Sequence, residues 1–248
     1  MDRAYLVMDW SVFDVILPGG APQLSPDQPH RDIDSLLSGM KNAYLEAVLA
    51  LLQFESEVRL QEEVLARRPA PDPALSREQQ MRAHFAAEFG MPWGVRITLA
   101  VYHAKTFVFS LDTFQMMLAA LIQTVDPTLK PTLQEQAERL AHHFPGLKAV
   151  RDSMHHQEDR VRGLRGQYKK ARIDPVPLNN WLARGGGKVF VGVSLYNDRL
   201  GGTAADGTFQ EVGVNMIGVQ VVREVLQAVA NTLPPRSRHP EKFPSGLT

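Results

Sequence analysis

The chain has 248 residues, with 27 lysine and arginine residues against 27 aspartate and glutamate residues, and it has no cysteine. Balanced charge excludes a strong overall field for an ionic partner, and the lack of cysteine excludes disulfides, thiolate metal sites and cysteine nucleophiles. Asp9 and Asp14 interrupt the apolar N-terminal stretch, and no uninterrupted apolar run reaches about 18 residues. We therefore expect a cytoplasmic protein without a secretion signal or a membrane span.

Five helices are predicted in the first two thirds of the chain. Apolar side chains recur there every three or four residues, which places them on one face of a helix, and prolines mark the segments between the helices. The run from residue 95 to 124 is apolar around most of its circumference, which predicts a helix in the middle of a bundle. The predicted helices cover residues 31–66, 76–90, 95–124, 132–144 and 147–172.

Polar residues at the helix starts have predicted structural roles. Ser76 with Gln79, and Thr132 with Glu135, have the spacing of capping boxes. Asn215 is suited to cap a final helix. Within the apolar central helix we expect a buried polar network. It would consist of Tyr102, His103, Lys105, Ser110 and Asp112.

The composition changes after Pro175. The segments KVFVGVSLY, RLGGTA and TFQEVGVN read as three strands separated by turns, and an amphipathic helix follows Asn215. We therefore predict a mainly α fold, a bundle of four to five helices with a small C-terminal β-meander and a terminal helix. The predicted divisions are a bundle over residues 31–172, an appendage over 173–233 and a disordered, proline-rich tail over 234–248.

Residues 151–156, RDSMHH, are the stretch that suggests chemistry, because they open a segment with seven lysines and arginines against three acids. On a helix, Arg151 would lie beside His155, and Asp152 beside His156, whereas Arg151 and His156 would be about 140° apart. A guanidinium binds phosphate oxygens with two parallel hydrogen bonds, and histidine exchanges protons near neutral pH. Asp152 could orient His156. These groups suit metal-independent cleavage of RNA through its 2′-hydroxyl.

This stretch resembles the motif of the HEPN superfamily, in which an arginine, a polar residue and a histidine lie on a late helix of a helical bundle. The resemblance covers residues 31–172 and implies a metal-independent endoribonuclease whose site forms between two subunits, in toxin–antitoxin or antiviral settings. It implies that Arg151 binds phosphate, His156 handles protons and Asp152 orients the histidine, with His155 as the alternative catalytic histidine. Arg160, Arg162 and Arg165 would then bind the RNA.

Other interpretations of the same residues stay open. Arg151 and Asp152 also suit the surface of a helix start. The family motif allows four to six residues between the arginine and the histidine, and Arg77 with His84 and Arg96 with His103 meet this spacing as well as Arg151 with His156 does. A metal site formed by His155, His156, Glu158 and Asp159 is a weaker alternative, and no cofactor is expected. The chain would accordingly be either a homodimeric ribonuclease, whose partners are RNA and a cognate antitoxin, or a non-catalytic interaction module that binds another protein.

Overall fold

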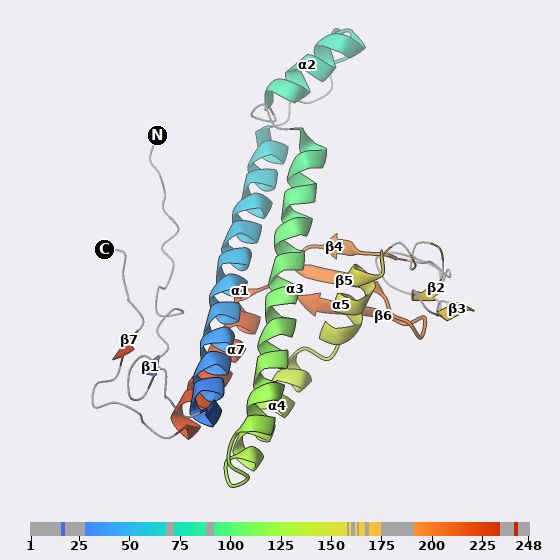
Figure 1. The fold of residues 1–248 in the computed structure, drawn as a ribbon. Coiled ribbons are helices and arrows are strands. Elements are labelled where there is room, and N and C mark those ends of the chain that lie inside the picture. The colour runs from blue at the N-terminus through green and yellow to red at the C-terminus, as the bar shows by residue number, and fades with distance from the viewer. Residues whose placement is uncertain are drawn as a thin grey trace.

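The computed structural model describes residues 16–17, 28–67, 72–87, 92–157, 159, 162, 164–166, 169–174, 191–233 and 241–242. In these ranges the chain is mainly helical, with a small antiparallel sheet beside two long helices (Figure 1). The predicted fold, a helical bundle with a β-meander and a terminal helix, is confirmed.

Two long helices form the centre of the molecule. Helix α1 (Gln28–Arg67) and helix α3 (Trp93–Thr124) run side by side. Helix α2 (Arg77–Ala87) lies beyond the C-terminal end of α1 and the N-terminal end of α3 (Figure 1). At 1.5 Å per residue, α1 is about 60 Å long. The predicted helices over residues 31–66 and 95–124 are confirmed, and the one over 76–90 is confirmed for residues 77–87, since residues 88–90 lie outside the described part of the chain.

One buried apolar cluster joins the helices to the sheet. Its largest fully buried side chains include Tyr44 of α1 and Phe107 and Phe114 of α3. Burial raises the pKa of the Tyr44 phenol well above its usual value, and the charge of Arg223 partly opposes that rise. Helix α4 (Lys130–His143) packs against helix α7 (Met216–Thr232), which also contacts α1. The terminal helix thus shares the core of the bundle.

Helix α3 is apolar enough, by length and composition alone, to cross a membrane. An 18-residue window within Gly94–Thr124 has a mean hydropathy of 1.3, and half of this window is buried inside the protein. The buried half faces α1 and the rest of the core, as in the central helix of a helical bundle. The expectation that the chain has no membrane span stays a prediction.

The three-stranded meander is confirmed, with strands in the order β4, β5, β6 and all neighbours antiparallel. The strands are β4 (Ser194–Tyr196), β5 (Arg199–Thr203) and β6 (Phe209–Gly213). The turns between them use left-handed backbone at Asn197, with φ 52°, and at Gly207, with φ 90°. A hydrogen bond of 2.6 Å from Oγ of Ser153 to the backbone oxygen of Thr203 anchors the sheet to helix α5 (Leu147–His155).

The predicted continuous helix over residues 147–172 is wrong, because α5 ends at His155 and residues 164–166 and 169–172 are strands; Gln157 and Asp159 are again helical. Strand β2 (Leu164–Gly166) and strand β3 (Lys169–Arg172) follow and pair antiparallel. Glycine in a helix interior costs about 1 kcal/mol relative to alanine, and this segment contains both Gly163 and Gly166. The continuous basic helix is therefore not formed.

The predicted caps have different outcomes. Ser76 and Gln79 form the expected reciprocal pair, with bonds of 2.9 and 3.3 Å between each backbone N–H and the other side chain. Asn215 caps α7 by accepting from the Gly218 N–H at 3.1 Å. The box at Thr132 is wrong, because α4 begins two residues earlier with a proline in its first turn and has no side-chain cap.

A short strand pair joins a segment from the first part of the chain to one from the last part. Strand β1 (Ile16–Leu17) pairs antiparallel with strand β7 (Glu241–Lys242). Residues 241–242 of the predicted disordered tail are therefore ordered in a strand, and the rest of residues 234–248 lie outside the described part of the chain.

Candidate functional site

Helix α5 carries the predicted catalytic motif and is strongly amphipathic. Its apolar residues Leu147, Val150 and Met154 recur at helical spacing and are buried in the core. A polar stripe beside them faces the outer side of α3. The residues of this stripe are Lys148, Arg151 and His155.

Two contacts of the polar stripe hold α5 against α3. Nε of Arg151 lies 3.2 Å from Oδ1 of Asp112, and the His155 ring packs edge-to-face on the Phe109 ring with the centroids 5.0 Å apart. The structure therefore brings His155, rather than His156, onto the face of Arg151. Both predicted catalytic residues serve there as packing contacts between two helices.

The polar residues of α3 do not form one buried network: the Tyr102 and His103 rings pack edge-to-face with centroids 5.5 Å apart, while the other three residues have separate partners. Nζ of Lys105 donates to Oε1 of Gln157 at 3.4 Å, a third link to the end of the α5 segment. Oγ of Ser110 donates to the backbone oxygen of Thr106 at 2.9 Å. Tyr102 is 62% exposed. The network was predicted for the buried surroundings of α3, but these side chains lie on several sides of the helix.

The charge of Arg151 is balanced by two carboxylates of the same chain. Besides Asp112, the carboxylate of Asp152 lies 3.3 Å from Nη1 of Arg151. The Arg151 and Asp112 side chains are 25% and 10% exposed. Nε of Arg151 makes no well-aligned hydrogen bond, although Asp112 is within ion-pair distance, so this contact is held by charge. A phosphate would have to compete with two carboxylates for this guanidinium.

The predicted orientation of His156 by Asp152 differs from the observed contacts. The backbone N–H of His156 donates to the backbone oxygen of Asp152 at 3.1 Å, because His156 is the C-cap of α5. The Asp152 carboxylate faces Arg151 instead. His156 is half-buried and has non-helical backbone angles. The four residues of the motif are neighbours, but the expected carboxylate–imidazole hydrogen bond is not among the described contacts.

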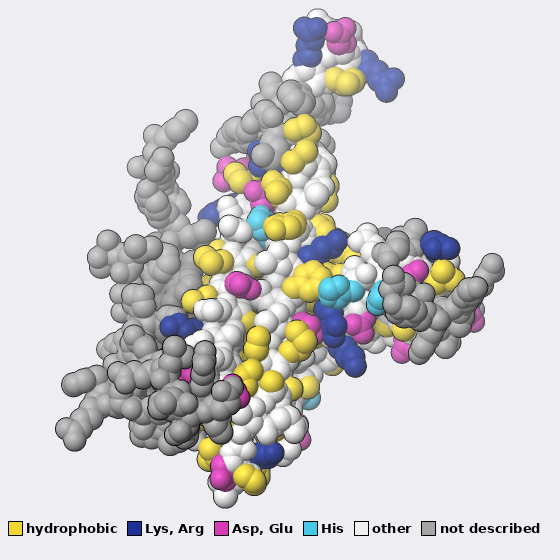
Figure 2. All heavy atoms as spheres, in the orientation of Figure 1, with side chains coloured by type: hydrophobic (Ala, Val, Ile, Leu, Met, Phe, Trp, Pro, Cys, Tyr) yellow, Lys and Arg dark blue, Asp and Glu magenta, His cyan; other side chains and the backbone are white. Residues whose placement is uncertain are grey.

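The predicted RNA-binding arginines do not share a helical face. Arg162 is exposed in a turn, Arg165 lies on β2, and Arg160 lies outside the described residues. Basic, acidic and histidine side chains gather where α5 meets α3 (Figure 2), so this edge is mixed in charge. Among the described residues, no group of three His, Asp or Glu side chains is placed to hold a metal ion, and Glu158 lies outside them.

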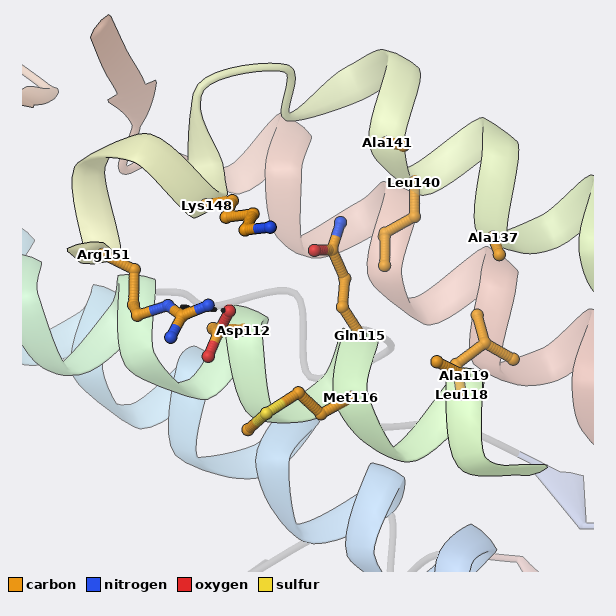
Figure 3. Close-up of a pocket in the computed structure, with 10 residues that line it drawn as sticks. All are labelled: Asp112, Gln115, Met116, Leu118, Ala119, Ala137, Leu140, Ala141, Lys148 and Arg151. Atoms are coloured by element: carbon orange, nitrogen blue, oxygen red, sulfur yellow. Dashed lines mark ion pairs between the residues drawn. The ribbon is translucent and has the colours of Figure 1, made fainter. Parts of the chain in front are cut away.

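A pocket of about 300 Å³ opens beside Arg151 between α3, α4 and α5 (Figure 3). Lys148 and Gln115 point toward the same space, next to the Arg151–Asp112 pair, and alanine and leucine side chains form its other end. Sequence reasoning missed Lys148. Its position three residues before Arg151, on the same helical face, was the available signal.

A second hollow follows the outer side of α1 and is called the α1 groove below. It consists of two adjoining pockets of about 320 and 510 Å³ that share Val58, Glu62 and Asn197. One wall is α1, and the other is formed by the first helical turns of α3 and by the meander. Its apolar lining residues are Phe54, Val58, Leu65, Ile97, Ala100, Leu195 and Val214.

The Arg151–Asp112 pair should couple measurably in a double-mutant cycle with Arg151→Ala and Asp112→Ala. We expect a coupling energy of about 1–2 kcal/mol in urea denaturation, because both charges are largely shielded from water. The control is the exposed pair Arg82–Glu78 on α2, whose side chains are 80% and 75% exposed. Its coupling should stay below about 0.5 kcal/mol. Equal coupling energies would contradict the structural role given to Arg151.

Comparisons of the chain with protein-family models, with curated proteins and with solved structures find no match. The resemblance to the HEPN superfamily therefore rests on the residues of the motif alone.

Proposed function

We propose that the chain is a non-catalytic helical interaction module whose α1 groove binds a basic amphipathic helix of a partner protein. The observation that carries this proposal is the continuous groove with an apolar lining and an acidic rim, between the bundle and the meander. Grooves of this kind receive the apolar face of a helix. The motif on α5 supports the same conclusion, because Arg151 and His155 are used to hold α5 on α3.

The apolar lining has the spacing that a helical ligand needs. Phe54, Val58 and Leu65 succeed one another at four and seven residues along α1, so they form one stripe. Leu65 and Ile97 are 50% and 41% exposed, and both line the same pocket, so they form part of one continuous apolar surface rather than isolated exposed side chains. Phe54 is buried beneath the groove, so a partner helix would cover Val58, Leu65 and Ile97, which have exposed surface.

The rim decides the charge of the partner. Three acidic residues line the groove, Glu55, Glu62 and Asp198, and Arg59 is the one basic residue among its lining residues. The lining therefore carries two net negative charges. Partial burial raises the pKa of Glu55 above its usual value, and Arg59 opposes that rise. Lysines or arginines flanking the apolar face of the bound helix would complement this rim.

A pair of model peptides tests the groove. A labelled peptide of about four helical turns, with leucine at helical spacing and lysine elsewhere, should bind at least ~10-fold more tightly than its counterpart with glutamate in place of lysine. Val58→Arg should abolish binding of the lysine peptide, because it places a like charge in the groove. The matched control is Ile217→Arg, at a 64%-exposed position on α7. Equal binding of both peptides, or equal loss in both variants, would reject the proposal.

A second candidate function is the metal-independent endoribonuclease, acting as a homodimer. It is favoured by the mixture of groups at the α5 edge, where Lys105, Lys148 and Arg151 outnumber Asp112 and Asp152 and both histidines of the motif have solvent-accessible surface. Because five residues along a helix correspond to a large rotation about its axis, the partner subunit would supply the second half of the site.

The ribonuclease is tested with the purified chain and single-stranded RNA in EDTA. If it acts, cleavage leaves 2′,3′-cyclic phosphate ends, and His156→Ala reduces the rate by at least ~100-fold at an unchanged melting temperature. His155→Ala serves as the comparison, because His155 packs on Phe109 and its loss should lower the melting temperature as well. Cleavage that survives both substitutions, or no cleavage by the wild-type chain, would exclude this function.

A further inference from the structure

We infer that the pocket between α3, α4 and α5 binds a small organic monoanion, a carboxylate with a short apolar body, through Lys148 and Gln115. This site is separate from the α1 groove and does not depend on either proposed function. It shares one wall residue, Arg151, with the motif on α5.

The polar end of the pocket has two side chains with unused hydrogen-bonding capacity. Lys148 is exposed, and within the described residues neither Lys148 nor Gln115 has a hydrogen bond or an ion pair. Lys148 extends from α5 and Gln115 extends from α3 toward the same space (Figure 3). An ammonium and an amide N–H that converge in this way can donate together to the two oxygens of a carboxylate.

The charges of the lining favour one negative charge on the ligand. Among the lining residues, Lys148 and Arg151 are cationic and Asp112 is anionic, and Asp152, which does not line the pocket, also pairs with Arg151. Arg151 is already paired with Asp112 at 3.2 Å, which leaves Lys148 as the cation with no partner among the described lining residues. A carboxylate would balance this charge, whereas an amine would be repelled by Lys148.

The other end of the pocket sets the size and the apolar character of the ligand. Leu118 and Ala119 of α3, with Ala137, Leu140 and Ala141 of α4, form its walls. Its volume of about 300 Å³ is at the lower end of the range for ligand pockets. Three alanines keep this space open, since any larger side chain at these positions would enter it. The geometry therefore fits a ligand with a short aliphatic or aromatic body.

The test is titration calorimetry of the full chain with hexanoate, 1-hexanol and hexylammonium. Hexanoate should bind saturably, 1-hexanol at least ~10-fold more weakly, and hexylammonium not measurably, because only the carboxylate accepts charge-assisted hydrogen bonds from Lys148. Lys148→Gln should weaken hexanoate binding by at least ~10-fold. The matched control is Lys130→Gln, because Lys130 is also on the bundle surface, in the first turn of α4, and does not line this pocket.

A second variant tests the apolar end independently. Ala137→Phe fills the space from α4 and should abolish hexanoate binding while the helical circular dichroism is unchanged. Equal affinities for hexanoate and 1-hexanol, equal loss in the Lys148 and Lys130 variants, or full binding by Ala137→Phe would each overturn the inference. Absence of saturable hexanoate binding would overturn it as well.

Discussion

Replacing Phe107 with alanine should lower the free energy of unfolding by about 3–5 kcal/mol, as large core truncations do. The Phe107 side chain is completely buried in α3. It also approaches α7, since a Cβ at Gly218 would lie 3.7 Å from the Phe107 ring. The cavity left by alanine would therefore weaken the contact between the terminal helix and the bundle. Urea denaturation followed by circular dichroism measures the loss.

Phe109→Ala is the matched control, because it removes the same side chain two positions away on the same helix. Phe109 is only partly buried and packs against the His155 ring, so we expect a loss of about 1–2 kcal/mol. Both variants should unfold in one transition, since α7 and the bundle share one core. Equal losses, or a separate transition for α7 in Phe107→Ala, would contradict the packing described.

Gly202→Ala should lower the free energy of unfolding by about 2–3 kcal/mol, because it adds a methyl group where β5 meets α5. A Cβ at Gly202 would lie 2.8 Å from the backbone oxygen of Gly192 and 3.1 Å from Cβ of Ser153. To relieve these contacts, the backbone at Gly192 would have to shift, and α5 would have to move away from β5 and lengthen the 2.6 Å bond from Ser153 to Thr203. A decrease in melting temperature of about 5–10 °C is expected.

The control for this substitution is Gly94→Ala in the first turn of α3. A Cβ there would meet no atom within 4 Å. Alanine should therefore stabilise the protein by up to about 1 kcal/mol through its higher helix propensity. Opposite signs for the two glycine-to-alanine substitutions are the expected result. A Gly202→Ala variant as stable as the wild type would show that α5 is not seated on the sheet as described.

The position of α5 explains why the catalytic motif and the observed site differ. Its apolar stripe fixes one face in the core, and the remaining stripe with Arg151 and His155 must then lie along α3. A partly buried guanidinium needs a counter-charge, and Asp112 supplies it from an otherwise apolar helix. The same residue types that suit RNA cleavage therefore also suit the attachment of one helix to another.

The sequence alone determined those features that depend on neighbours in the chain. Helical periodicity identified α1, α2 and α3, and the caps at Ser76 and Asn215 were predictable because a cap bonds to an N–H three residues away. Alternation and turn residues likewise identified the meander. Residues 147–172 were predicted as one basic helix, but α5 ends at His155 and the strands β2 and β3 follow.

Only the tertiary structure decided where the charged groups of the motif are directed. Asp112 and Arg151 lie on helices separated by the whole of α4, and a local pattern contains no information on which distant carboxylate neutralises a given arginine. The same holds for the α1 groove and for the pocket beside Lys148, because each is lined by segments that meet only after packing. Packing brings together residues that are remote in the chain, and the chemistry of a site depends on that proximity.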